Sequence, residues 1–127
     1  MITAAFRALL LSDPDVSRAV SSRIYPMTAP ETASLPLITY QRISESSDAD
    51  LLTHTTRIQA DCYGQTYDGA LQLAESVRRA LLNRTYETET ETIMNISFDS
   101  SVDFYDAETR LTRIVSDFML FWKFNQR

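Results

Sequence analysis

Two side chains of the sequence could act as a nucleophile or a general base, His54 and Cys62. A catalytic base needs a nucleophile or an orienting carboxylate beside it. The segment around His54, Thr53-His54-Thr55-Thr56, has no such signature, so we interpret His54 as a solvated strand residue. Cys62 could react if a cation or a helix end lowered its pKa. It alternates with Ile58 and Ala60 on the apolar side of an expected strand, which favours a buried, inert thiol.

Acidic side chains form two groups, Asp48 with Asp50 and Asp103 with Asp106 and Glu108. Glycosidase chemistry needs two carboxylates across a cleft, one of them kept protonated by burial. Both groups lie in or beside expected turns, where Asp commonly caps and solvates the chain. The sequence has only 2 glycines, too few for a phosphate-binding loop, and one Cys with one His gives no metal-ligand cluster. We therefore predict no enzymatic activity, no cofactor and no metal.

The composition favours one soluble domain over residues 1–127. The chain is 44% hydrophobic and 23% charged, enough to bury a core and remain in solution. Its net charge is −5 and its pI about 4.7, with Arg and Lys scattered. Tight binding to a phosphate backbone usually needs a basic patch, so specific nucleic-acid binding is not expected. An acidic surface that lets DNA pass without sticking fits this balance.

No segment of the sequence indicates secretion or a membrane partner. The start, Met1 to Leu11, has neither a basic region nor a long apolar region followed by a cleavage site. No stretch approaches the ~20 apolar residues of a membrane span. The single cysteine is consistent with a reducing compartment. We expect the protein to be made and kept in the cytosol until it joins an assembly.

The first half of the sequence predicts two short helices and a hairpin. Apolar residues at helical spacing start near Ile2, and Asp13-Pro14 is typical of the cap and first position of a second helix reaching about Val20. A short extended piece at 24–26 and a loop at 27–34 follow. Alternation predicts a strand over 35–43, a polar excursion over 44–50 and a return strand over 52–63.

The second half predicts a helix and a second hairpin. Gly64 ends the return strand, and Thr66 can cap a helix whose apolar residues recur from Ala70 to Leu81. The alternating Glu and Thr run over 86–92 is expected to be a solvated loop or edge extension, with Glu87, Glu89 and Glu91 as candidate partner contacts. Strands over 93–105 and 111–124 complete the chain, with Met94 on the same face as Ile96 and Phe98, and Trp122 in the core.

These elements predict an α+β fold. Short connections make most strand pairs antiparallel, so we expect a mostly antiparallel sheet of about four strands with two or three helices packed on one face. The helix after Thr66 would cover Ile58, Ala60 and Cys62. Long strands would then present hairpin tips to a neighbour or a stacked partner.

Five segments together resemble the tail-completion proteins of long-tailed bacteriophages, also called tail terminator or head–tail joining proteins. Their joint order and spacing carry the resemblance, which covers most of the chain. The segments are Ala8-Leu9-Leu10 with Asp13-Pro14 and Val16; Arg23-Ile24-Tyr25-Pro26; Leu35-Pro36-Leu37-Ile38-Thr39-Tyr40-Gln41-Arg42; Gln59-Ala60-Asp61-Cys62-Tyr63 followed by Tyr67; and Asp103-Phe104-Tyr105 with Glu108-Thr109.

The resemblance implies a structural virion protein. Such proteins are small α+β subunits that form a closed ring, commonly a hexamer, at the head-proximal end of the tail, on phages of the siphovirus type and in prophages or gene transfer agents. The ring would stop polymerisation of the tail tube protein and join the tail to the neck or head-completion proteins, and DNA would pass through it. Before assembly the subunit would be in the host cytoplasm. Glu45, Asp48 and Asp50 are candidates to line the lumen or an interface.

Three alternatives remain open from the residues. The nearest is another neck component, such as a head-completion or stopper ring. The second is a small α+β hydrolase that uses Cys62 or His54. The third is a monomeric ligand- or peptide-binding module that adds a strand at the edge near Thr88.

Overall fold

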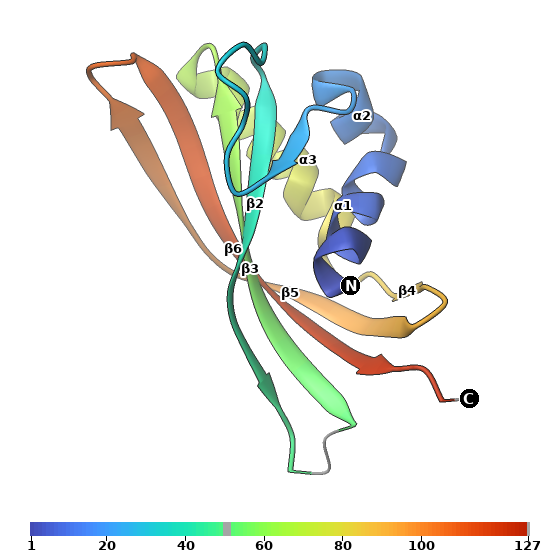
Figure 1. The fold of residues 1–127 in the computed structure, drawn as a ribbon. Coiled ribbons are helices and arrows are strands. Elements are labelled where there is room, and N and C mark those ends of the chain that lie inside the picture. The colour runs from blue at the N-terminus through green and yellow to red at the C-terminus, as the bar shows by residue number, and fades with distance from the viewer. Residues whose placement is uncertain (50–51, 127) are drawn as a thin grey trace.

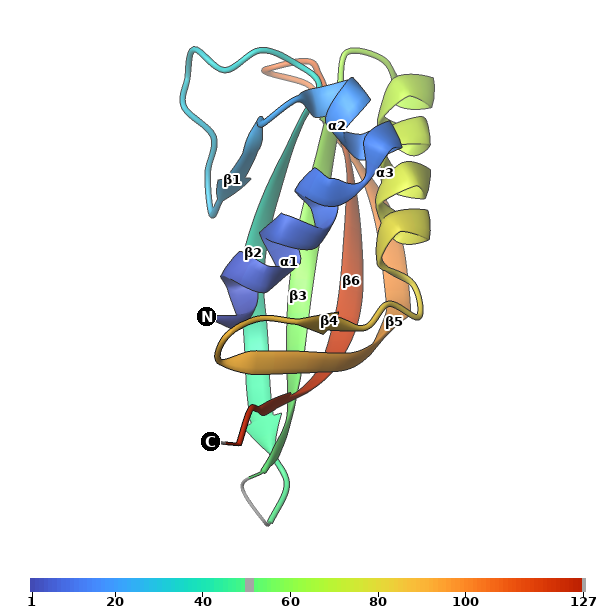
Figure 2. The same cartoon turned by 90° about the vertical axis from the view of Figure 1, so that its right-hand side faces the viewer.

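The computed structural model describes residues 1–49 and 52–126. These residues form one strongly twisted sheet with three helices packed on one face (Figures 1 and 2). The sheet has six strands in the order β1-β2-β3-β6-β5-β4. The elements are α1 (Ile2–Ser12), α2 (Pro14–Val20), β1 (Ile24–Pro26), β2 (Leu37–Ser47), β3 (Thr53–Gly64), α3 (Tyr67–Leu81), β4 (Tyr86–Glu87), β5 (Glu91–Asp106) and β6 (Leu111–Phe124).

The α+β class is confirmed, and the strand count differs from the expected four. The long strands β2, β3, β6 and β5 form the expected antiparallel sheet. Two short strands extend it: β1 pairs with β2 in parallel, and β4 pairs with β5. With 3 and 2 residues respectively, these strands are too short to produce a period in the sequence.

The helices begin where their capping residues predict. The Asp13 carboxylate accepts hydrogen bonds from the backbone N–H groups of Asp15 and Val16, 3.1 and 3.0 Å away, and so caps α2. The Thr66 hydroxyl accepts from the Gly69 N–H at 3.0 Å and caps α3. A Cβ atom at Gly64 would lie 2.6 Å from the backbone nitrogen of Ala70, so only glycine permits this close approach of β3 to α3.

The β2–β3 hairpin is longer than expected. Residues 44–47 were expected in a loop, but they continue β2 and pair with residues 54–57 of β3. A bulge at Ile43 places that apolar side chain in solvent, 43% exposed, and shifts the register of the polar residues that follow. Backbone pairing with the threonine-rich start of β3 therefore extends a strand whose side chains gave no apolar face. Asp50 lies outside the described residues.

Another bulge changes the faces of β5. The sequence pattern placed Met94 with Ile96 and Phe98, but Met94 is the bulged residue and is 38% exposed, while Ile93 and Ile96 are fully buried. The extra residue at a bulge reverses the alternation on one side of it. Asp99 forms a second bulge in the same strand.

The core lies between the helices and the face of the sheet that they cover. Phe118 of β6 is fully buried at its centre, with its ring centroid 6.3 Å from that of Phe6 and 5.8 Å from that of Phe98. Trp122 is 3% exposed, which confirms it as a core residue, and its Nε1–H donates to the Thr56 hydroxyl at 2.8 Å. No helix of the described residues lies on the opposite face of the sheet (Figure 1); we call it the open face.

Candidate assembly surfaces

The two candidate nucleophilic side chains do not form a catalytic site. Cys62 is fully buried under α3, and burial raises the pKa of its thiol far above the ordinary value. His54 is half-buried rather than solvated, because its ring stacks on Trp122 with centroids 4.5 Å apart and meets the edge of Phe124 at 5.1 Å. Its Nε2 atom is buried and has no hydrogen-bond partner in the described structure. The solvated interpretation of His54 was wrong because strand β6 brings two aromatic rings beside it.

The acidic residues of the second group serve turns and local contacts. Asp106 accepts hydrogen bonds from the N–H groups of Glu108 and Thr109 at 2.9 and 3.4 Å. Asp103 accepts from the Tyr67 hydroxyl at 2.5 Å, and this bond to a carboxylate raises the pKa of Tyr67. Among the described residues, no cluster of His, Cys, Asp or Glu could hold a metal ion. Over the same residues, no helix is long and apolar enough to cross a membrane.

The far end of the β2–β3 hairpin is mostly polar, although the apolar Leu52 is 57% exposed there. We call its described residues, 44–49 and 52–53, the polar end (Figure 1). Glu45 accepts from the Thr56 hydroxyl at 3.1 Å and forms an ion pair with Arg42 at 3.4 Å. Asp48 accepts from the Thr53 hydroxyl. Both carboxylates are therefore ordered by hydrogen bonds and still reach solvent. Their predicted place in a lumen depends on an assembly and stays a prediction.

The Glu and Thr run forms a compact edge beside α1. Tyr86 and Glu87 make strand β4, and the Thr88 hydroxyl accepts from the N–H of Glu91 at 3.0 Å to close the turn. Glu87 and Glu89 are exposed, as expected for candidate partner contacts. Glu91 begins β5 and is 5% exposed, with its carboxylate 3.4 Å from the N-terminal amine. Of the three candidates, Glu91 therefore cannot reach a partner, because tertiary packing covers it.

The end of the β5–β6 hairpin exposes three large apolar side chains that sequence reasoning missed, among charged residues such as Asp103 and Glu108. Val102, Phe104 and Tyr105 are 51%, 47% and 64% exposed. The hairpin turns away from the helices at the end of the sheet opposite to the polar end (Figure 1), and we call residues 102–111 the apolar end. The Arg113 guanidinium lies 4.9 Å from the centre of the Phe104 ring. The signal was the close spacing of three large apolar residues, in a segment that had drawn attention for its carboxylates and for the family resemblance.

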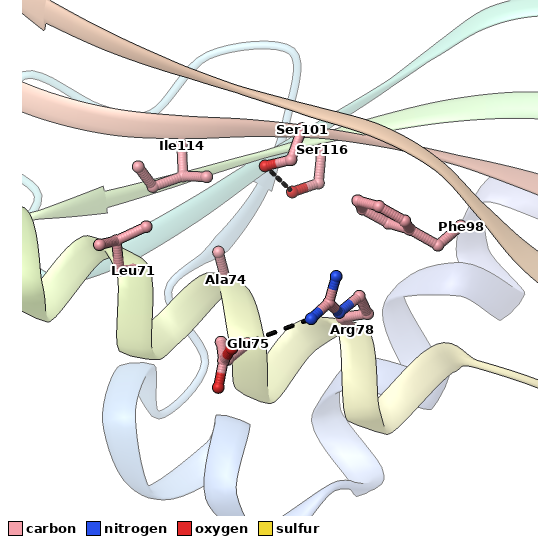
Figure 3. Close-up of a pocket in the computed structure, with 8 residues that line it drawn as sticks. All are labelled: Leu71, Ala74, Glu75, Arg78, Phe98, Ser101, Ile114 and Ser116. Carbon is pink, nitrogen blue, oxygen red and sulfur yellow. Dashed lines mark hydrogen bonds and ion pairs between the residues drawn. The ribbon is translucent and has the colours of Figure 1, made fainter.

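Two hollows adjoin this hairpin, one smaller than a usual small-molecule site and one within the usual range of volumes. A slot of about 130 Å³ lies between α3 and the strands β5 and β6, where Arg78 stacks over Phe98 at 4.9 Å and pairs with Glu75 at 3.8 Å (Figure 3). Ligand pockets are usually ~300–1,000 Å³. A wider hollow of about 460 Å³ on the open face is lined largely by apolar residues, among them Leu35, Leu37 and Leu111. Its walls are the 27–35 loop and the adjacent strand ends.

Comparison with known proteins agrees with a structural rather than a catalytic chain. The structure is similar to a chain in the virion of a native gene transfer agent (GTA) particle, with a TM-score of 0.77, 15% sequence identity and coverage of 96% of this chain and 94% of that one. At this identity the similarity shows the fold. No curated protein matches the sequence. The family model described as tail completion protein gp17 matches residues 4–122. The chain therefore belongs to the tail completion protein gp17 family, and it is a structural protein, not an enzyme.

Proposed function

We propose that this protein forms a ring at the head-proximal end of a phage-type tail, where it ends tube polymerisation and joins the tail to the neck. The observation that carries the proposal is the family match over residues 4–122. The described surface supports it: the polar end and the apolar end are two chemically different surfaces at opposite ends of one sheet. A subunit of such a ring has different surroundings on different sides, because it adjoins its neighbours, the passing DNA and the proteins above and below it, and chemically different surfaces suit these surroundings.

The partners of the ring follow from the same proposal. One axial face meets the tail tube protein, and the other meets the neck. The genome passes through the opening without specific binding, which suits a net charge of −5. The particle is a phage, a prophage product or a gene transfer agent of the long-tailed type, and six copies fit the common symmetry of such tails. The subunit would be in the host cytoplasm before it joins the virion.

Electron microscopy of particles made without this protein tests the proposal. We expect overlong tails or tails without heads, and normal particles after the wild-type protein is supplied in trans. Tails of normal length attached to heads would contradict termination. If tails have normal length but stay separate from heads, the protein acts instead as another neck component, such as a stopper ring. Reconstruction of the joint in wild-type particles then decides between the two positions.

The polar end supplies the candidate lumen residues Glu45 and Asp48, with Asp50 as the third of the original candidates. In the proposed ring these carboxylates approach the DNA and repel its phosphates. Asp48→Lys should slow DNA release from purified particles, most at low salt, because an added cation attracts phosphate. Glu89→Lys makes the same charge change in the exposed turn beside β4 and serves as the control. Equal release rates for both variants and the wild type, or a polar end on the outer rim of the ring, would remove these residues from the lumen.

A further inference from the structure

Two long strand edges of the sheet carry no partner strand among the described residues. Strand β1 covers β2 only at residues 38–40, and a last bond joins the Met27 N–H to the Tyr40 carbonyl. Beyond it the outer edge of β2, residues 41–47, is free. On the other side, β4 covers β5 at residues 92–93 and a last bond joins the Asn83 N–H to the Ile96 carbonyl. The outer edge of β5, residues 97–106, is free beyond that point.

We propose that the free edge of β2 pairs with the free edge of β5 from a second copy of this chain, so that the sheets of neighbouring subunits join edge to edge around the ring. This inference rests on the proposed ring. Unpaired strand edges are templates for strand addition, because their backbone donors and acceptors have no partner except water. The two edges lie on opposite sides of one sheet, which is the arrangement that a heterologous, closing interface requires.

The strand directions agree with rotational symmetry. Because β2, β3, β6 and β5 are successively antiparallel, β2 and β5 run in opposite directions in one subunit. A rotation about an axis that runs roughly along the strands leaves the direction of each strand unchanged in the next subunit. The β2 edge of one copy therefore meets the β5 edge of its neighbour in antiparallel orientation, the more stable form of pairing.

The positions of the free segments also agree with closure. Within one subunit, Ser44 at the middle of the free β2 edge lies across the sheet from Ser97 of β5. Val102, near the middle of the free β5 edge, lies four residues further along β6. If Ser44 of one copy pairs with Val102 of its neighbour, each copy is shifted by about 13 Å along the strand direction relative to the previous one. The four long strands of one copy span about 19 Å of sheet width. This shift over this width corresponds to a strand tilt of roughly 35°, within the range typical of closed barrels.

Charge at the proposed seam favours a second copy as the partner. Arg42 pairs with Ile58, and Asp103 pairs with Ile114, so both charged side chains project from the helix-covered face of their strands. The register above places Arg42 of one copy within about two residues of Asp103 of the next. The Arg42 side chain is 55% exposed in the single subunit and can reach across.

Proline substitutions on the two edges test the pairing. The Asp48 N–H donates to the Thr53 carbonyl, so the neighbouring Ser47 N–H points outward. The Asp106 carbonyl accepts from Arg110 within the turn, so the N–H groups at alternate residues of β5 before it, Ser101 among them, also point outward. Ser47→Pro and Ser101→Pro each remove one outward donor and leave the internal ladder intact. Ser47→Ala and Ser101→Ala are the matched controls, because they change the side chain and keep the N–H.

The variants are supplied in trans to particles that lack the protein, after circular dichroism has shown native folding and a thermal midpoint near that of the wild type. We expect each proline variant to reduce ring incorporation at least tenfold and both controls to assemble. If the free protein forms rings at high concentration, an equimolar mixture of the two proline variants should stop at dimers, since each pair has one intact seam. Proline variants that assemble as well as the controls would overturn edge pairing. If the wild-type protein itself does not enter tails, the proposed function fails instead.

Discussion

The two hairpins of this sheet have opposite surfaces. The polar end exposes serines and carboxylates that bond within the chain, including Glu45 and Asp48. The apolar end exposes Val102, Phe104 and Tyr105, each near or above half of its full surface. Water stabilises the first arrangement, whereas the second leaves apolar area that only a partner can cover. Two hairpins of similar backbone structure therefore present surfaces suited to different surroundings, water at one end and a partner at the other.

The difference between the ends is also one of anchoring. At the polar end a partly buried hydrogen-bond chain runs from Trp122 through the Thr56 hydroxyl to Glu45 and ties the hairpin to the core. At the apolar end the contacts lie at the surface: Tyr67 of α3 donates to Asp103, and Arg113 covers one face of Phe104. Such surface contacts hold the hairpin in place and leave its rings available. The largest assembly effects should therefore come from the apolar end, and the largest stability effects from the core and the anchors.

A cavity in the core that supports both hairpins should have the largest effect on stability. Phe118 lies fully buried under α1 and the middle of the sheet. Phe118→Ala should lower the free energy of unfolding by about 3–5 kcal/mol, because it leaves a cavity that the surrounding strands cannot fill. Urea unfolding followed by circular dichroism measures the loss. A cost below about 1 kcal/mol would mean that the core around Phe118 repacks.

Loss of the aromatic ring at the apolar end should affect assembly rather than folding. Phe104→Ser removes an exposed ring, so the free energy of unfolding should change by less than about 1 kcal/mol. Incorporation into tails should fall roughly 30-fold, as for an interface anchor worth about 2 kcal/mol. Met94→Ser, at an exposed apolar residue away from both ends, is the control. Equal loss for both variants would contradict a special role of the apolar end.

Breaking the anchor of the polar end should cost stability. Thr56→Val keeps the shape of the side chain but leaves the Trp122 N–H buried without its acceptor and removes one donor from Glu45. We expect a loss of about 1–3 kcal/mol. Thr55→Val, on the neighbouring half-buried threonine, is the matched control and should change stability little. A Thr56 variant as stable as the control would show that water replaces the lost acceptor.

The smallest predicted effect concerns the open face between the two ends. Asp61 is 6% exposed, and burial raises the pKa of its carboxyl although Gln59 and Arg113 both donate to it. The folded state therefore binds the proton more tightly than the unfolded chain, and this contribution to stability is present below about pH 3.9 and is lost as pH rises through the folded pKa. The difference in unfolding free energy between Asp61→Asn and the wild type should move in favour of the variant over that rise.

Urea titrations at several pH values between 3.5 and 6.5 measure that difference. Arg113 loses its charged partner in Asp61→Asn at every pH, so the slope of the difference with pH carries the test and its absolute value does not. A slope of the opposite sign would show that the Arg113 ion pair at 2.9 Å outweighs burial.

Much of the fold could be predicted because local chemistry agrees with it. Asp13 and Thr66 cap the helices that they were expected to cap, Gly64 sits where β3 meets α3, and Ile58, Ala60 and Cys62 lie under that helix. The bulges at Ile43, Met94 and Asp99 could not be predicted, because a bulge depends on the partner strand as well as on its own residues. One inserted residue reverses the face of its neighbours, so the face of Met94 was predicted wrongly.

The candidate site was predicted less well than the fold. The polar end was identified by its composition, but it is strand rather than loop over residues 44–47. Glu91 was grouped with Glu87 and Glu89 by sequence, and only packing against the chain start separates it from them. His54 was assigned to solvent because neither Trp122 nor Phe124 is near it in the chain.

The sequence by itself determined the α+β class, the helix caps, the inert place of Cys62 and the absence of a catalytic signature, because these depend on residues close together in the chain. The order and spacing of five segments along the sequence also indicated the tail-completion family. Only the tertiary structure decided which strands end up without a partner and which apolar residues remain exposed. Those properties depend on how far β1 and β4 extend along their neighbours and on where the helices stop covering the sheet. The surfaces available for assembly are therefore what long-range packing leaves uncovered.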